Sequence, residues 1–564
     1  MKENYKIPQI PESDQTPTIK LLLGIIQNHN IQLQQKDIQL QQQDIQVQEL
    51  NQTVTKLGEE IQTLKDEINR LKKHKGKPRI NPTQLTDDPK EPDDPNKPPK
   101  KRAGSAKRKK TAELQIHEEK IIRLENIPEG ARHKGYQGYV VQDLIIQVKN
   151  TRYRLERWQY PDGTYHIAQL PADLKGQHFG PNLKSYAINQ HHGNIVTQPL
   201  LLKQLLSFGI DISKGTLNNI LTEDLDAFHI EKEAILREGL RSSSYIHVDD
   251  TGARHQGKNG YCTHIGNEFF TYFESTPSKS RINFLTLLQA GSTEYTLNQD
   301  AFEYCEKQKL NKKALDILKE SLNFEKNLKN ECLIFEDKKA FEEHMDALGI
   351  TKALVRKTIT EAALLGSLMA RENFRNLKII SDDAGQFNVL QHALCWIHAV
   401  RHIEKLIPLN DMHAVDLEAI QSKIWDLYKT LQAYQKAPTE VFKIEIRNTF
   451  DSIFQTKTSF MMLNSTLERL YKNKEELLLV LEYPELKLHN NPSENDIREY
   501  VTKRKRSGGT RSDAGRKARD TFASLKKTCM KLKINFWDYL IDRCSQTFEI
   551  PKLCDLVHKA ATSG

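Results

Sequence analysis

The chain of 564 residues carries 83 lysines and arginines against 74 aspartates and glutamates, a net charge of +9, and 38% of its residues are hydrophobic. No apolar run approaches the ~18 residues that a membrane-spanning helix needs, which predicts a soluble protein of several domains. The basic balance suits a polyanionic partner without requiring one.

Cysteine usage and the start of the chain indicate the compartment. The seven cysteines are odd in number and include no CxxC pair, which argues against a disulfide framework and a four-cysteine zinc ribbon. The N-terminal segment MKENYKIPQIPESDQ has no apolar core behind a basic lead, so no signal peptide is expected. We therefore expect a reduced, cytoplasmic protein.

Residues 18–75 form a glutamine-rich segment with heptad spacing. One seam recurs every seven residues, and a second joins it from Leu50 onward; the first seam is Leu33, Leu40, Val47, Val54, Ile61 and Ile68. This pattern predicts a coiled coil and self-association, with a single helix packed on its own protein as the alternative. Residues 76–115 follow as a disordered linker rich in proline, and its basic run at 100–110 either grips phosphates or is simply solvated.

Two small regions are predicted next. Residues 116–175 have strand-like runs at 139–149 and 153–160 and a turn at 161–163, which predict a small β-rich module. Residues 176–235 are predicted to be helical, with Ser213 capping a helix through Leu221 after a turn at Phe208 and Gly209. Helix, turn and short helix fit a helix-turn-helix DNA reader, although an ordinary helical pair fits equally.

Residues 240–506 are predicted to form an α/β domain. A strand ending at Asp249, a turn at 258–260, two further strands and a helix at 280–288 precede a fourth strand that ends at Asp382. This order of elements, with acids on the first and fourth strands, is the plan of ribonuclease H. Residues 293–373 are interpreted as a helical insertion into it.

Three acids stand at element boundaries in this domain: Asp249, Asp382 and Glu494. Carboxylates held on rigid elements are the ligands that a pair of Mg²⁺ ions needs for phosphoryl transfer. Each acid also has a structural interpretation, because the aspartates could be turn residues and Glu494 could be the third residue of a capping box begun by Asn491.

Several motifs together resemble the insertion-sequence-66 family of DDE transposases. They are VDDTG at 248–252, GKNG at 257–260, Ser381-Asp382, CWIH at 395–398, NNPSE at 490–494, SGGTR at 507–511 and FWDYL at 536–540. The resemblance covers most of residues 116–540. It implies a ribonuclease H-like fold, double-stranded DNA as partner, element-encoded accessory proteins in some cases, and Mg²⁺, with Mn²⁺ as a substitute.

The resemblance also implies the site. Asp249, Asp382 and Glu494 would be the catalytic, metal-binding triad, and the family pattern favours the first acid of each doublet, which leaves Asp250 and Asp383 secondary. His398, Asn491 and Arg498 are further secondary candidates. Cys395 and His398 have too few partners nearby to predict metal ligation, and no zinc is expected. Family members often carry a cysteine-rich zinc module where residues 153–171 have no cysteine.

Basic residues follow the third acid and are predicted to contact DNA. They are Lys503, Arg504, Lys505, Arg506 and Arg511. Glu494 and Arg498 are also spaced as a local helix pair. Residues 507–564 are interpreted as a basic, helical C-terminal tail.

The predicted function is metal-dependent cleavage at the ends of an insertion sequence, followed by strand transfer. Two alternatives remain open from the sequence. One is an inactive or domesticated transposase that binds and bridges DNA, and the other is a ribonuclease H-like nuclease that cleaves without joining. The coiled coil favours the assembly of paired ends over simple hydrolysis.

Overall fold

The computed structural model describes residues 178–324 and 332–563, residues 115–171 except 124 and 128, and scattered positions between 16 and 46. The chain divides into two compact units, residues 1–141 and 142–564. Described positions between 17 and 46 are helical, as the heptad pattern predicts. The rest of the predicted coiled coil and residues 76–114 of the predicted linker lie outside the described residues.

The predicted β-rich module is wrong in extent. The run 139–149 forms no strand, and within residues 115–171 the described strands are only β1 (Arg157–Gln159) and β2 (Tyr165–Ile167). The predicted turn is present, because Asp162 Oδ1 accepts from Thr164 N at 2.9 Å and from Thr164 Oγ1 at 2.6 Å. The residues of both strands are exposed, and a two-stranded hairpin with no packed face is of marginal stability.

The helical region before the sheet is broken more often than predicted. Its elements are α2 (Pro181–Ile188), the π-helical turn η3 (Asn189–Gly193), α3 (Gln198–Ser207), α4 (Lys214–Thr222) and α5 (Asp226–Ser242). The predicted cap is confirmed, because Ser213 Oγ accepts from Thr216 N at 3.0 Å. Helices α3 and α4 contact each other, and Leu217 and Leu221 bury one face of α4.

A five-stranded mixed sheet forms the centre of residues 142–564. Its order is β5-β4-β3-β8-β9, with β3, β4 and β5 antiparallel and with β8 and β9 parallel to β3. The strands are β3 (Tyr245–His255), β4 (Lys258–Gly266), β5 (Thr271–Thr276), β8 (Lys378–Ser381) and β9 (Gln391–Leu394). The predicted antiparallel triplet followed by a fourth strand is confirmed.

Two predicted boundaries in this sheet are wrong. Strand β3 does not end at Asp249 but runs to His255, because β4 pairs with it along that whole length. The hairpin turn lies at Gln256 and Gly257, and both have positive φ, 48° and 78°. Two successive positive φ values suit the right-handed twist of a tight hairpin, so residues 258–260 belong to β4.

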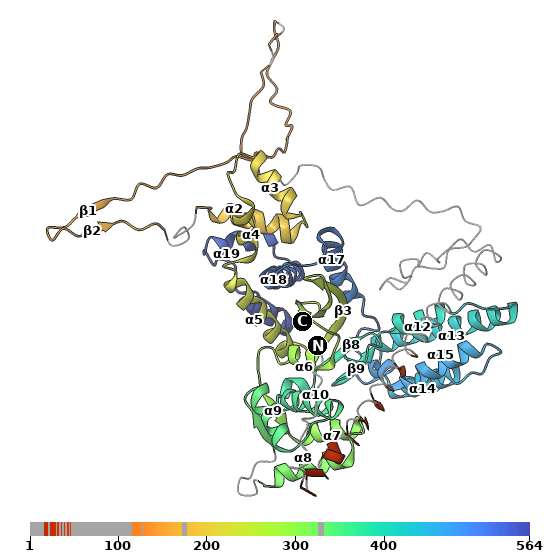
Figure 1. Ribbon diagram of the computed structural model, residues 1–564. Coiled ribbons are helices and arrows are strands. Elements are labelled where there is room, and N and C mark those ends of the chain that lie inside the picture. The colour runs from red at the N-terminus through yellow and green to blue at the C-terminus, as the bar shows by residue number, and fades with distance from the viewer. Residues whose placement is uncertain are drawn as a thin grey trace. The chain divides into compact units, whose positions relative to one another are not determined.

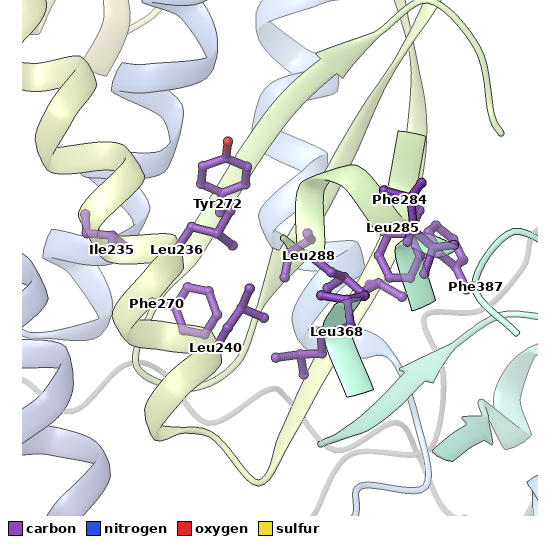
Figure 2. Packing of buried hydrophobic residues seen from close by; sticks show 14 of the residues in the cluster. Ile235, Leu236, Leu240, Phe270, Tyr272, Phe284, Leu285, Leu288, Leu368 and Phe387 are labelled. Atoms are coloured by element: carbon purple, nitrogen blue, oxygen red, sulfur yellow. The ribbon is translucent and has the colours of Figure 1, made fainter. Parts of the chain in front are cut away.

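The interior is apolar on one face of this sheet. Side chains from α5, from α6 (Arg281–Leu288) and from α10 (Ala353–Met369) pack against the strands (Figure 2). Figure 2 shows Leu236 and Leu240 beside Phe270, and Phe284 beside Phe387, whose ring centroid is 4.9 Å away. Burial of such side chains supplies about 1.5–3 kcal/mol each before entropy is counted.

The predicted C-terminal tail is part of the core. Residues 507–564 supply α18 (Asp513–Lys531), α19 (Phe536–Cys544) and α20 (Leu553–Thr562). Helix α18 contacts β5 and α5, α19 contacts α2, and α20 contacts α5. Phe522, Leu525 and Cys529 are fully buried. Helix α18 is basic in composition but carries a buried apolar stripe, so the prediction that residues 507–564 form a tail outside the core is wrong.

Two insertions extend the domain, one between β5 and β8 and one after β9. The predicted one, residues 293–373, is not purely helical, because β6 and β7 pair within it; its elements are β6 (Tyr295–Leu297), α7 (Gln299–Lys307), α8 (Lys312–Phe324), β7 (Leu333–Phe335), α9 (Lys338–Ala347) and α10, with α11 (Glu372–Arg375) just beyond. The second lies between β9 and α17 (Asn491–Ser507) and was not placed by the sequence.

The second insertion is helical. Helices α12, α13, α14 and α15 contact one another beside β8 and β9 (Figure 1); their ranges are α12 (Trp396–Glu404), α13 (Asp411–Lys436), α14 (Glu440–Phe454) and α15 (Met461–Lys472), followed by α16 (Lys474–Leu477) and the 3₁₀ turn η4 (Leu479–Leu481). Among the helices of the described ranges, none is long and apolar enough to cross a membrane.

Candidate functional site

The register of β3 and β8 places Asp249 and Asp382 together. The last parallel pair is His247 with Ile380, and each aspartate lies two residues further along its strand direction. Residues two apart share one face of a sheet, so both carboxylates lie on the face that carries His247. Strand β8 ends at Ser381, which leaves Asp382 at its carboxyl end.

The pKa of Asp249 also reflects the nearby Asp382. Its pKa is raised to about 7, first by burial and then by the negative charge of Asp382, with smaller contributions from Asp250 and Glu494. A backbone hydrogen bond from Asp250 N, at 2.7 Å, acts in the opposite direction. The charges of Asp382 and Glu494 therefore both act on the Asp249 carboxyl.

A buried polar network positions the third acid. Asn490, which precedes α17, donates through Nδ2 to Val248 O at 2.9 Å and accepts from His247 Nδ1 at 2.9 Å. Ser493 Oγ lies 2.7 Å from His264 Nδ1, and His264 is paired with Asp249 in the register of β3 and β4. These contacts fix the first turn of α17 on the strands that carry Asp249.

The capping-box interpretation of Glu494 is wrong. Helix α17 begins at Asn491, and Glu494 N donates to Asn490 O at 3.2 Å. Asn491 is therefore the first helical residue. The side chain of its neighbour Asn490 donates to Val248 O on β3 and does not cap the helix. The carboxylate of Glu494 is free to point away from its own helix.

The partners of Glu494 lie on α12. Arg401 Nη1 donates to Glu494 Oε1 at 3.1 Å, and His398 Nε2 lies 3.5 Å from the same oxygen. Arg401 Nη1 is also 3.2 Å from His398 Nε2, which must accept because a guanidinium has no acceptor. Burial and then the charge of Arg401 lower the pKa of His398. Arg498, the predicted local partner, is exposed.

The second acid of each doublet lies in different surroundings. Asp250 accepts from Thr263 Oγ1 at 2.6 Å and from Gln386 Nε2 at 2.8 Å, and burial is the main cause of its raised pKa. Asp383 faces the second insertion, 3.3 Å from Asn473 Nδ2 and 3.5 Å from Arg469. Strand parity also puts Asp250 on the opposite face from Asp249.

The predicted DNA-contacting cations divide into two groups. Lys503 is buried, with Nζ 2.8 Å from His192 Nδ1, and this placement removes it from the candidates for DNA contact. Arg504 is half-buried and donates to Gly252 O. Lys505, Arg506 and Arg511 are exposed.

Cys395 joins α12 to α17. Its Sγ accepts from Asn490 N at 3.2 Å, and burial raises the pKa of this thiol to about 11. Cys395 therefore helps to place both Glu494 and its partners. His247 stands between Ile246 and Val248 in a predicted strand, and a histidine in such an apolar run is the sequence signal for this buried polar network.

The three predicted acids have the chemistry of divalent-cation ligands. Carboxylate oxygens are the donors that Mg²⁺ prefers, and the raised pKa of Asp249 indicates a cluster that a positive charge would stabilise. Within the described residues, however, no three His, Cys, Asp or Glu side chains converge closely enough to hold a metal ion. Glu494 is paired with Arg401 Nη1 at 3.1 Å.

Comparison with known proteins decides the family. The model of the Transposase IS66 family matches residues 376–518. A protein from Sinorhizobium fredii (strain NBRC 101917 / NGR234), described as uncharacterized protein y4jO, is 41% identical over 312 residues, which cover 55% of this chain and 94% of that protein. The chain belongs to the Transposase IS66 family.

The resemblance inferred from the motifs is thereby confirmed. The segment of this IS66-family chain that matches the model begins before β8 and ends inside α18. It therefore includes Asp382, Arg401 and Glu494, whereas Asp249 lies before it. The strand pairing described above is what brings Asp249 to the matched segment.

Proposed function

We propose that this protein is a DNA transposase that cleaves the ends of an insertion sequence and joins them to target DNA, and that its central sheet is ribonuclease H-like. The sheet order β5-β4-β3-β8-β9, antiparallel on one side and parallel on the other, supports this fold assignment. Membership of a transposase family supports the activity.

One observation carries the proposal: the β3–β8 register puts Asp249 and Asp382 on one face of the sheet, and the charges of Asp382 and of Glu494 from α17 both act on the Asp249 carboxyl. These acids stand 133 residues (382 minus 249) and 112 residues (494 minus 382) apart, and the β3–β8 pairing and the anchored start of α17 support the proposal that they act together. Such a cluster costs stability through repulsion, and active sites are where that cost is usual.

Asp249, Asp382 and Glu494 would hold Mg²⁺, or Mn²⁺ in its place, which when bound supplies charge neutralisation at the phosphodiester and activation of the attacking oxygen. In the first reaction water adds to phosphorus and the bond to the 3′-oxygen breaks, which frees a 3′-hydroxyl. In the second reaction that hydroxyl attacks a target phosphodiester and displaces another 3′-oxygen. The role of the strands is to keep the two aspartates aligned throughout both reactions.

DNA contact is proposed for the exposed cations at the end of α17 and in the turn after it. Lys505, Arg506 and Arg511 are exposed and can contact phosphates, and Arg498 is exposed about two turns before Lys505 on α17. We keep the proposals of a homo-oligomer assembled through residues 18–75, of a helix-turn-helix formed by α3 and α4, and of accessory proteins encoded by the element.

The test changes Asp249, Asp382 or Glu494 singly to Ala and measures Mg²⁺-dependent cleavage and strand transfer on a plasmid that carries the element ends. We expect each loss to exceed about a thousandfold, because removal of one metal-holding group disables the whole site. End binding should survive. Asp383→Ala is the matched control, with an expected loss below about tenfold.

The alternatives predict different products in the same assay. Full activity of the Glu494→Ala protein would refute the triad. A footprint on the ends without metal-dependent breakage would indicate a DNA-bridging protein. Cleavage whose 3′-ends are never joined would indicate a nuclease.

A further inference from the structure

The feature that carries a further inference is the ion pair between Arg401 and Glu494. Among the described residues, Asp249 and Asp382 have no cationic partner within ion-pair distance, whereas Glu494 has Arg401 at 3.1 Å. Arg401 Nη1 donates to Oε1 of Glu494, and His398 Nε2 lies 3.5 Å from the same oxygen. The acid that comes from a helix is thus neutralised, while the two strand acids are left to repel each other.

This pairing opposes metal binding. For Glu494 to act as a ligand beside the aspartates, its Oε1 must leave the guanidinium, and Arg401 must then lose a half-buried ion pair. Both side chains are partly exposed, 28% and 25%, so the pair can separate without moving the helices. Separation is unfavourable unless Arg401 gains another anion.

The surroundings of Arg401 fit a phosphate as that anion. Only Nη1 is engaged within the described part of the chain, so the other guanidinium donors remain available for a two-point contact with a phosphate. The partly exposed residues of α12 are His398, Arg401 and His402, followed by exposed Lys405, spaced along one side of the helix. A duplex laid along this side would bring phosphates to Arg401.

We propose that Arg401 is a positioning residue that holds Glu494 away from the aspartates until a DNA phosphate takes over its guanidinium. The idea rests on the proposed function and adds a regulation of that site by DNA. It has a thermodynamic consequence: DNA and divalent metal must strengthen each other's binding, because each favours the separated state of the same ion pair.

The test measures Mn²⁺ binding to the full-length protein without DNA, by the electron paramagnetic resonance signal of free Mn²⁺. Arg401→Gln should bind Mn²⁺ about five- to tenfold more tightly than the wild type, because the competing cation is gone. Arg401→Lys, which keeps the charge, should stay within about twofold of the wild type. In a Glu494→Gln background, Arg401→Gln should have no tightening effect.

A second measurement adds duplex DNA of mixed sequence, with the Asp249→Asn protein supplying the background from Mn²⁺ held by DNA itself. DNA should tighten Mn²⁺ binding by the wild type, and this coupling should vanish in Arg401→Gln. If Arg401→Gln does not fold, the wild type alone tests the proposal, because absence of coupling between DNA and Mn²⁺ would overturn it.

The outcomes separate this inference from the proposed function. If Asp249→Asn leaves Mn²⁺ binding unchanged, the proposed metal site itself fails. If Asp249→Asn abolishes binding while Arg401→Gln binds Mn²⁺ no more tightly than the wild type, only the inference about Arg401 fails. Tightening that persists in the Glu494→Gln background would also overturn it, because Arg401 would then act on another group.

Discussion

At the scale of single residues, the candidate site depends on buried polar side chains that lie outside the three acids. Asn490 is fully buried and makes side-chain hydrogen bonds to Val248 and His247, while its backbone N–H donates to Cys395. A buried amide with all these partners satisfied specifies one position for the chain. That position sets where α17 begins and hence where Glu494 lies.

Asn490→Ala should destabilise the protein by about 2–4 kcal/mol, because Val248 O and His247 Nδ1 would be left buried without partners. Urea unfolding followed by circular dichroism measures the change. The adjacent Asn491→Ala is the control and should cost less than about 1 kcal/mol, since Asn491 is only partly buried. Equal effects of the two changes would show that Asn490 does not anchor the helix.

At the scale of elements, α18 protects the free edge of the sheet. Three of its side chains, four residues apart, meet alternate backbone N–H groups of β5: Thr528 Oγ1 accepts from Thr271 at 3.1 Å, Ser524 Oγ from Phe273 at 2.8 Å and Asp520 Oδ2 from Ser275 at 2.8 Å. The match works because four helical residues rise about 6 Å, close to the advance of two strand residues. An open edge would otherwise invite pairing with another chain.

The turn between α17 and α18 is fastened to the β3–β4 hairpin. Thr510 N donates to Arg254 O at 2.9 Å, and Gln256 N donates to Thr510 O at 2.8 Å. Gly509 is required for this approach, because a Cβ there would lie less than 3.0 Å from Arg254 O, a backbone atom that cannot yield. The exposed cations Lys505, Arg506 and Arg511 are held around this junction.

Gly509→Ala should therefore lower the free energy of unfolding by about 1–3 kcal/mol and weaken DNA binding, because the turn must leave the hairpin. Thermal melting and a fluorescence-anisotropy titration with duplex DNA measure the two effects. Gly215→Ala, in α4, is the control, because its nearest new contact would be an ordinary 3.8 Å; it should be neutral or stabilising by up to about 1 kcal/mol. A Gly509→Ala protein as stable as the control would contradict the assigned packing.

At the scale of the molecule, the C-terminal helices and the insertions complete the structure around the central sheet. Helices α18 and α20 pack on α5 and the sheet, so chain regions about 300 residues apart share one core. The second insertion supplies α12, which carries the partners of Glu494. The site is thus assembled from the strands, from an insertion and from a helix that the C-terminal region supports.

Truncation after Ser507 should abolish cooperative unfolding and give aggregated protein, because it exposes the edge of β5 and removes fully buried side chains such as Phe522. Size-exclusion chromatography and circular dichroism measure this. Arg506→Gln is the comparison, because it removes an exposed charge and should weaken DNA binding with a stability change within about 0.5 kcal/mol. A folded, monodisperse truncated protein would restore the interpretation of residues 507–564 as a tail.

Local patterns were sufficient wherever a feature depended on neighbours in the chain. The cap at Ser213, the antiparallel strands after residue 243 and the strand that leads to Asp382 follow from hydrophobic period and turn chemistry. The two wrong predictions, of a strand at 139–149 and of a C-terminal tail, have a common cause: local composition does not show which surfaces are buried. The run 139–149 has strand composition without a packing surface, and α18 has tail-like charge with a buried stripe.

The sequence by itself determined the family, the α/β class of the central domain and the identity of the three acids as candidates, because these rest on residue types in short motifs. Only the tertiary structure decided that Asp249 and Asp250 lie on opposite faces of the sheet and that β3 lies beside the strand that leads to Asp382, since these depend on strand register and parity. It also decided that Glu494 is paired with Arg401 and that Lys503 is buried. Such contacts join residues about 90 to 310 positions apart, and no local pattern of the sequence encodes them.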